Sequence, residues 1–320
     1  MIQQIYITDY LSDAAARPAD MIHSLVEQCP IFLRAQWQVN SLSPLKSLWQ
    51  CLGASGDATS AVLCARMPLP VAPPAFCLLP VHLGLRRDTF SLQSVVPLAA
   101  DVYAVLTERL KKHFLEEFTI HEDPSQRYWW VVPVREINAQ MQWPQDCLYQ
   151  QAMQWQPQGP DASVIRQWTN EIQMLLHEAA YSPAVTNWPE TLNSLWFASV
   201  GHIPAWPAMQ LTVSGQGDIF SGLQASRLAA AQFIPMSTMF ADQQMTDGIW
   251  VADQWQTVNW AEVSRALQTG RISALRVVIP FAERSIEISY KKQFRWQFWR
   301  KPYTLETLLQ QLETTLAAAR

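Results

Sequence analysis

Three glycines mark the junction where the sequence could bind a phosphate. Gly215, Gly217 and Gly222 stand between a predicted strand, AMQLTVS, and a predicted helix. Glycines at such a junction let backbone amides approach an anion closely. The third glycine is misplaced for a dinucleotide fingerprint, and Asp218 puts a carboxylate where the anion would bind. The favoured interpretation is a tight turn that leads into the helix and binds no ligand. The alternative is that backbone amides at the helix amino terminus bind a phosphate.

The candidate ligand-binding residues extend from this junction back into LNSLWFASVG (residues 192–201). That uncharged run predicts a strand buried on both faces. The candidates offer backbone amides, hydroxyls and one carboxamide, a set suited to a phosphorylated small metabolite. They are Asn193, Ser194, Ser199, Gly201, Gly215 and Gly217.

The serine, cysteine and histidine residues match no catalytic or metal-binding motif. Ser199 in ASVG and Ser221 in FSG lack the G-x-S-x-G elbow that exposes a nucleophile. The five cysteines form no CxxC pair, which argues against a zinc knuckle and a disulfide framework. Residues 203–320 contain no histidine and cannot supply an imidazole to a metal. We expect no catalytic residue, no metal site and no cofactor.

The segment YKKQFRWQFWRKPY (residues 290–303) alternates basic and aromatic side chains. Such a mixture binds single-stranded nucleic acid, docks proteins, or forms a strand whose aromatic face is buried. We favour the strand, then protein docking, then nucleic acid. The candidate partner-binding residues are Lys291, Lys292, Arg295, Trp296, Trp299 and Arg300.

The composition favours a protein partner over nucleic acid or an anionic lipid surface. Charged residues make up 16% of the 320 residues, below the roughly 25% of typical domains, while there are 15 tryptophans. The net charge of −4 gives no general attraction to nucleic acid or anionic lipid. Exposed tryptophans are expected to anchor a protein partner. Besides Trp296 and Trp299, these are Trp129, Trp143 and Trp155.

Targeting signals are not apparent in the sequence. The amino-terminal MIQQIYITDYLSD has no basic region and reaches Asp9 before an apolar run of signal-peptide length develops. The weakly charged run of residues 67–85 contains five prolines and is too broken for a membrane helix. We therefore expect a cytoplasmic location and no membrane association.

The elements that position these residues predict an α/β protein with a three-layer sheet. Residues 1–60 form the amino-terminal part, with a strand at IQQIYITDYL and helices near residues 19–28 and 44–52. Residues 61–135 are an antiparallel α+β subdomain with a helix within residues 97–118. Its predicted strands are SAVLCARM, AFCLLPVHLGL, TFSLQSVV, FTIHE and RYWWVVP.

The rest of the chain is divided into a linker and a main domain. The linker covers residues 136–160, which are rich in Gln, Trp and Pro. The main α/β domain covers residues 161–320 and starts with a helix that carries one apolar stripe. Its other predicted elements are the buried strand, a strand–turn–helix unit with IFSGLQASRLAAAQF as the helix, a helix ending near Gly270, the strands ISALRVVIP and SIEISYKK, and a helix from Thr304 onward.

Several landmarks match one bacterial group. They are NEIQMLLHE (170–178), LNSLWF (192–197), DIFSGLQAS (218–226), LPVHLGLRRDTFSL (79–92), RYWWVVP and FWRK (298–301). In these landmarks the chain resembles the RpfE-type regulatory proteins. The resemblance implies a regulatory role.

The central motif is in turn similar to a segment of the archaeal-type cofactor-independent phosphoglycerate mutases of the alkaline-phosphatase superfamily. That resemblance implies a related fold, two divalent metals and a serine nucleophile. The chain departs from the mutase pattern where the chemistry lies, because AAYSPAV (179–185) lacks the expected Asn and Arg, and residues 197–201 lack the run of glycines. Asp9, after the first strand, is a candidate relic of a metal ligand.

These departures predict a non-catalytic, degenerate mutase-like protein that acts through protein contacts in a regulatory or assembly role. An enzyme or sensor that binds a phosphorylated metabolite is the first alternative. Single-stranded nucleic-acid binding through residues 290–303 is the second.

Overall fold

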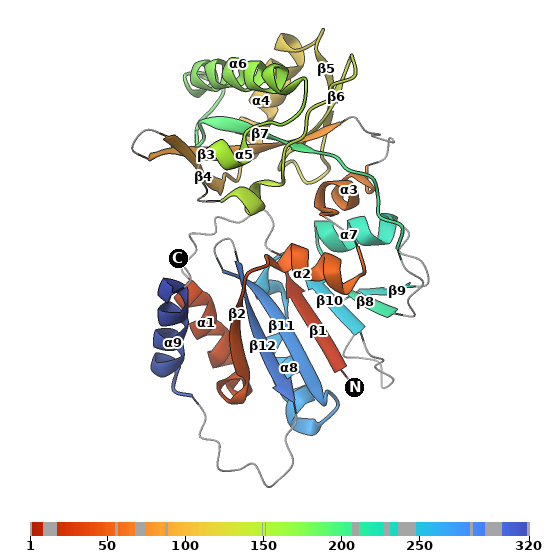
Figure 1. Ribbon diagram of the computed structural model, residues 1–320, viewed down its shortest axis with the longest axis vertical. Coiled ribbons are helices and arrows are strands. Elements are labelled where there is room, and N and C mark those ends of the chain that lie inside the picture. Colours follow the sequence, from red (N-terminus) through yellow and green to blue (C-terminus); the bar gives the residue numbers. More distant parts are fainter. Residues whose placement is uncertain are drawn as a thin grey trace. The chain divides into compact units, whose positions relative to one another are not determined.

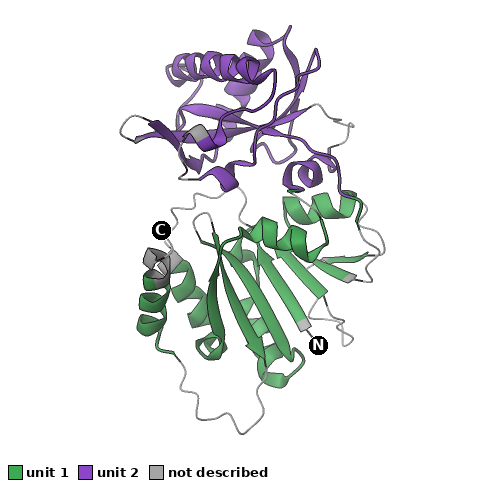
Figure 2. Cartoon of the chain, viewed as in Figure 1, with its two compact units in different colours: residues 1–10, 14–57, 205–320 green, residues 11–13, 58–204 purple. Residues whose placement is uncertain are grey.

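The chain folds into two compact units, which are coloured separately in Figure 2. The first unit contains residues 1–10, 14–57 and 205–320, and the second contains residues 11–13 and 58–204. The structure is a computed structural model, and it describes residues 2–8, 18–54, 57–67, 75–86, 89–148, 150, 152–206, 211–226, 231–235, 248–281, 284–291 and 303–318.

A seven-stranded sheet forms the centre of the first unit (Figure 1). In spatial order its strands are β2 (Gln36–Asn40), β12 (Arg284–Lys291), β11 (Ala274–Phe281), β1 (Ile2–Ile7), β10 (Gly248–Ala252), β8 (Leu211–Gln216) and β9 (Ala231–Pro235). The strands from β11 to β9 are parallel, whereas β12 and β2 continue the sheet antiparallel. The amino-terminal strand therefore lies inside the sheet, with neighbours on both edges.

Helices cover both faces of this sheet. On one face, Ile5 and Ile7 of β1 join the main core with residues from three helices: α1 (Pro18–Gln28), α8 (Trp260–Thr269) and α9 (Leu305–Ala318). Successive residues of a strand face opposite sides, so Gln4 and Tyr6 face the other layer. There α2 (Pro44–Cys51) reaches Gln4 through the Cys51 thiol, and α7 (Asp218–Ala225) packs beside β8 and β10. The predicted three-layer α/β class is confirmed.

Local sequence signals set several helix ends in this unit. Ser43 caps α2 by accepting a hydrogen bond from the Lys46 N–H, and Pro44 follows at the first helical position, where no donor is required. Asn259 caps α8 in the same way through the Glu262 N–H. Gly270 ends α8 with φ of 78°, a left-handed conformation that glycine adopts without strain.

The second unit is built around the long strand β3 (Phe76–Arg86). Along one edge β3 pairs with β7 (Ser194–Ser199), and along the other with β6 (Trp129–Pro133) and then β4 (Thr89–Val95). A hairpin joins β6 to β5 (Phe118–Glu122). Pro80 has no N–H to donate, and it lies where pairing with β6 ends at Leu78 and pairing with β4 begins at Val81.

Two helices, α4 (Ala100–His113) and α6 (Ala162–Ala180), share one core with this sheet. The ring of Trp168 on α6 meets Phe118 of β5 edge-on, with centroids 5.0 Å apart. Tyr103 of α4 stacks on Trp129 of β6 at 4.7 Å. The first contact holds the apolar stripe of α6 against the sheet, as the helical periodicity predicts, and the second holds α4.

The predicted domain boundaries differ from the observed units. Residues 161–204 were expected in the main α/β domain, but α6 and β7 belong to the second unit, and β7 pairs antiparallel with β3. An uncharged buried strand fits either kind of sheet, so its sequence does not identify its partner. The expected linker, residues 136–160, also packs in this unit: it contains a 3-10 helix, η2 (Pro144–Cys147), α5 (Ala152–Trp155) and buried Trp143.

Two predicted elements also differ in type. SAVLCARM was expected to be a strand but contains most of a short helix, α3 (Thr59–Cys64). IFSGLQASRLAAAQF was expected to be one helix, but α7 ends at Ala225 and residues 231–235 form β9. The edge strand β2 was not predicted. Short apolar runs rich in alanine and serine carry little periodicity, so tertiary packing decides their structure. Within the described ranges, no helix is long and apolar enough to cross a membrane.

Candidate functional site

A pocket of about 260 Å³ lies in the second unit between α6, β7 and the segment after α5. Its apolar lining consists of Leu83, Phe90, Met141, Trp155, Pro157, Leu195, Trp196 and Phe197. Its polar lining consists of Gln156, Arg166, Thr169, Asn170, Gln173 and Ser194. Apolar walls with a few polar groups are typical of binding sites for small molecules and side chains.

The helix α6 supplies most of the polar groups. Arg166, Asn170 and Gln173 are four and three residues apart, so they lie on one side of the helix. A different side of the helix carries Ile165 and Ile172, which are buried in the core. Burial of the apolar stripe therefore fixes the rotation of α6 and directs the polar stripe to the pocket.

The strand β7 and its surroundings form the aromatic side. The indole N–H of Trp196 donates to the Gln142 carbonyl at 2.8 Å, and the rings of Trp155 and Trp196 lie 5.0 Å apart. Ser194 is buried, and its hydroxyl lies 3.5 Å from the Gln173 carboxamide nitrogen. Hydrogen bonding and ring packing thus hold this side of the pocket in place.

Arg166 places a positive charge at the pocket. Within the described part of the chain, neither the Arg166 guanidinium nor the Asn170 carboxamide has a hydrogen-bond or ion-pair partner. The acidic residues near them are engaged elsewhere: Glu171 pairs with His113 at 3.1 Å, and Asp161 with Arg135 at 3.7 Å. A bound anionic group would therefore find a donor already exposed.

The ligand-binding residues predicted in the central segment have different positions. Ser194 lines the pocket. The Asn193 carboxamide instead accepts from the Leu83 N–H and donates to the Leu83 carbonyl, both at 2.8 Å. The Ser199 hydroxyl accepts from the Met141 N–H at 2.8 Å. Gly201 is exposed. The side chains of Asn193 and Ser199 therefore serve the fold.

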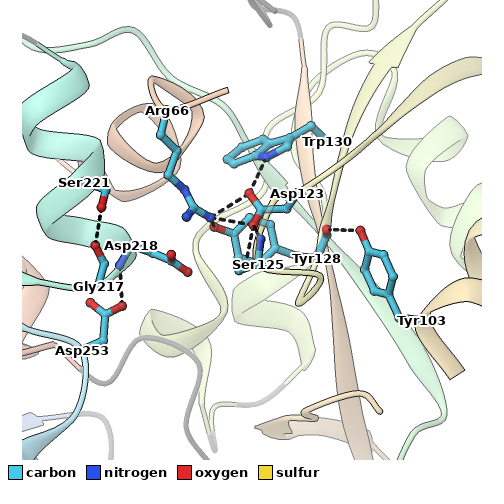
Figure 3. A network of polar contacts seen from close by, with 10 residues as sticks. All are labelled: Arg66, Tyr103, Asp123, Ser125, Tyr128, Trp130, Gly217, Asp218, Ser221 and Asp253. Carbon is cyan, nitrogen blue, oxygen red and sulfur yellow. Dashed lines mark hydrogen bonds and ion pairs between the residues drawn. The ribbon is translucent and has the colours of Figure 1, made fainter. Parts of the chain in front are cut away.

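Gly215 and Gly217 lie in the first unit, at the carboxyl end of β8. Thr8, Gly217 and Asp253 directly follow β1, β8 and β10, the edge where open α/β sheets commonly bind ligands. The Asp253 carboxylate occupies the amino terminus of α7, accepting from the Asp218 N–H at 2.7 Å (Figure 3). It also accepts from the Thr8 hydroxyl at 3.3 Å. The chain itself therefore supplies the anion at this position.

Packing explains both glycines without a phosphate. A Cβ at Gly215 would lie 2.2 Å from the Val251 carbonyl oxygen. Gly217 has φ of 98°, and its Cβ would lie 2.4 Å from the Asp253 carboxylate. Sequence reasoning singled out the glycines but missed Asp253. The signal for Asp253 was its position directly after the apolar run GIWVA of β10.

Burial raises the pKa of Asp253 to about 6, and the nearby charge of Asp218 adds to this increase. Hydrogen bonds from the backbone of Asp218 and Ile219 and from Thr8 lower the pKa. Desolvation exceeds these stabilising contacts, so the carboxylate costs free energy when it is ionised.

A second polar network, in the second unit, surrounds the buried Asp123 (Figure 3). Arg66 contacts both carboxylate oxygens at 2.7 Å, and the Trp130 indole donates at 3.1 Å. Ser125 donates through its backbone N–H at 2.8 Å. The network fastens Arg66, two residues after the end of α3, to the β5–β6 turn. Burial also raises the pKa of the nearby Cys64 thiol to about 12, which disfavours a reactive thiolate.

Metal ligands do not cluster in the described ranges, where no group of three His, Cys, Asp or Glu could hold an ion. Asp9 lies outside the described residues. So do Lys292, Arg295, Trp296, Trp299 and Arg300, whereas Lys291 is exposed at the end of β12.

The prediction that tryptophans are exposed as anchors for a partner was wrong at three positions. Trp129, Trp143 and Trp155 are all buried. Trp129 lies inside the α4–sheet core and donates to the Thr107 hydroxyl at 2.8 Å. A large indole ring buries more apolar area than most side chains, so it favours the core unless a partner covers it.

Comparisons with known proteins gave little further information. No protein-family model matches the chain, and no curated protein matches it. Among solved structures, it is similar to the cofactor-independent phosphoglycerate mutase from Thermoplasma acidophilum DSM 1728. The TM-score is 0.36 with 14% identity, over 91% of this chain and 89% of that one.

Proposed function

We propose that the protein is a non-catalytic binding protein that acts through contact with a partner protein, and that the pocket of the second unit is the contact site. The observation that carries the proposal is an apolar surface that extends beyond the pocket. Phe90 lines the pocket and is 53% exposed, and its cross-strand partner Leu85 is 70% exposed. Exposed apolar side chains beside a pocket are typical of protein-docking surfaces.

The geometry of the β3–β4 hairpin makes this surface continuous. Leu83 and Leu85 are two residues apart on β3, so they face the same side of the sheet. Paired residues of antiparallel strands also share a side, which adds Phe90. Leu83 and Phe90 border the pocket, and Leu85 continues the apolar surface past it.

The absence of catalysis is supported by the carboxyl edge of the first unit's sheet. A phosphorylated substrate at the amino terminus of α7 would meet the half-buried Asp253 carboxylate, which already accepts the Asp218 N–H. A second anion there would be repelled. Descent from a mutase-like ancestor, a regulatory or assembly role and a cytoplasmic location remain parts of the proposal that rest on the sequence motifs and composition.

Affinity capture with three full-length baits tests the contact site. We expect the wild type to retain a partner from native lysate that Phe90→Asp loses by about tenfold or more, because a charge opposes burial of that position. Leu115→Asp is the matched control, since Leu115 is 77% exposed and lies outside the pocket lining. Equal recovery of every protein by all three baits would contradict the proposal.

A separate assay tests the absence of catalysis. The purified protein should show no phosphoglycerate mutase or phosphatase turnover with added divalent metals. Turnover that chelation abolishes would show that the protein is an enzyme.

A further inference from the structure

We infer that the pocket recognises an aromatic side chain of the partner protein that neighbours a carboxylate. This inference rests on the proposed function, because it names the chemistry of the partner at the same site. Three features carry it: the aromatic wall, the Arg166 guanidinium and the Asn170 carboxamide, and neither polar group has a partner among the residues that the structure describes.

The aromatic wall and the volume of the pocket favour a ligand with a single aromatic side chain. Trp155 and Trp196 lie 5.0 Å apart with an interplanar angle of 55°, and Phe90 borders the same space. Tilted aromatic rings offer both faces and edges, which suits a further ring. The volume of about 260 Å³ lies just below the roughly 300–1,000 Å³ of drug-sized ligand sites. One aromatic side chain fits this space better than an extended cofactor.

Arg166 selects the charge beside that ring. Its guanidinium is planar and can donate two parallel hydrogen bonds to a carboxylate. The nearby acids on and before α6, Glu171 and Asp161, pair with His113 and Arg135. Since Arg166 and Trp196 line the same small pocket, the carboxylate belongs on the aromatic residue itself or on its neighbour.

The carboxamides favour a peptide over an isolated ring. Asn170 follows Arg166 by one helical turn, and Gln173 follows on the same side. Each carboxamide offers both a donor and an acceptor, as main-chain amides require. Leu85 lies outside the pocket beside Phe90 at its border, and it provides apolar surface for adjoining residues of the segment.

Two small probes of similar size separate the contribution of the aromatic ring to binding from the contribution of the carboxylate. They are N-acetyl-L-tryptophan, which carries a carboxylate, and N-acetyl-L-tryptophanamide, which is neutral. Binding of each to the full-length chain is followed by saturation-transfer NMR. We expect the carboxylate probe to bind about three- to fivefold more tightly, the range of a solvent-exposed ion pair, and to lose this advantage at high salt.

Two variants test whether Arg166 is the residue that recognises the carboxylate of the probe. Arg166→Gln should make the two probes bind equally. Arg127→Gln is the matched control, because Arg127 is exposed on the β5–β6 turn outside the pocket lining, and it should keep the preference. Loss of saturable binding of both probes in Phe90→Asp would place them in the pocket.

The outcomes distinguish this inference from the proposed function. If both probes bind the wild type equally and Arg166→Gln changes neither, carboxylate recognition is wrong while an aromatic docking pocket stands. If neither probe saturates the wild type up to its solubility limit, the aromatic pocket is wrong, and carboxylate recognition is wrong with it. Lysate capture that depends on Phe90 would still test the docking surface independently.

Discussion

The Oδ2 atom of Asp253 lies 2.7 Å from the backbone nitrogen of Asp218 and accepts its hydrogen bond at the first turn of α7. The positive end of the helix is thus satisfied by a carboxylate from the residue that directly follows strand β10. Asp253 is half-buried, so the interaction is partly shielded from water and salt. Substitutions at this contact should therefore have measurable effects on stability.

The first prediction concerns the pH dependence of stability. Burial raises the pKa of Asp253 from 3.8 to about 6. The folded state therefore binds more protons than the unfolded state between these values, and stability decreases as the pH rises from about 4 to about 6. Asp253→Asn should remove this component, worth at most about 3 kcal/mol at about 1.4 kcal/mol per pKa unit. The measurement is the melting temperature of both proteins against pH.

Asp101→Asn is a control of opposite sign. The Thr186 N–H donates to Asp101 at 3.1 Å and lowers the pKa of that exposed carboxylate. The contribution of Asp101 to folding stability is present above the pKa that this carboxyl has in the unfolded state, and it is lost as the pH falls. If the difference between wild type and Asp253→Asn does not vary between pH 4 and pH 7, Asp253 does not titrate as described.

The second prediction concerns Gly217. Substitution by alanine should destabilise the protein by about 1–3 kcal/mol, because φ of 98° disfavours a side chain and the new Cβ would meet Asp253. Gly201→Ala is the matched control, since nothing lies within 4 Å of its Cβ position, and it should change stability by less than about 0.5 kcal/mol. Equal effects in urea unfolding would contradict the close approach of Asp253.

The third prediction concerns the buried pair of Arg66 and Asp123. Arg66→Gln should destabilise the fold by about 3–5 kcal/mol, because it leaves the fully buried carboxylate without its cation. The exposed pair of Lys111 and Glu122 provides the comparison, and Lys111→Gln should cost less than about 1 kcal/mol. Both values come from denaturant unfolding. Similar losses in the two variants would show that burial of Asp123 does not matter.

The sequence predicted elements whose pattern is local. The central helix α6 and the strand β1 followed from apolar periodicity, and the β5–β6 hairpin from two strands around a turn. The sheet that receives β7 could not be predicted, because its pairing with β3 joins residues more than a hundred positions apart. Long-range pairing leaves no periodic signal in either strand.

The candidate site was predicted only in part. Ser194 was identified, whereas Arg166, Asn170 and Gln173 look like the ordinary solvent face of an amphipathic helix. Their role depends on Trp155 and Trp196, which the fold brings beside α6. Asn193 was identified as a ligand residue because an exposed carboxamide and one that binds backbone have the same sequence signature.

The last prediction separates these two asparagines. Asn193→Ala should destabilise the protein by about 1–3 kcal/mol, because it leaves the Leu83 N–H and carbonyl without their partners where β3 shifts its register with β4. Asn170→Ala should leave stability within about 0.5 kcal/mol, since that carboxamide has no partner in the described part of the chain. Thermal unfolding of both variants gives the comparison. The reverse order would mean that Asn170 belongs to the fold and that Asn193 is the residue available to a ligand.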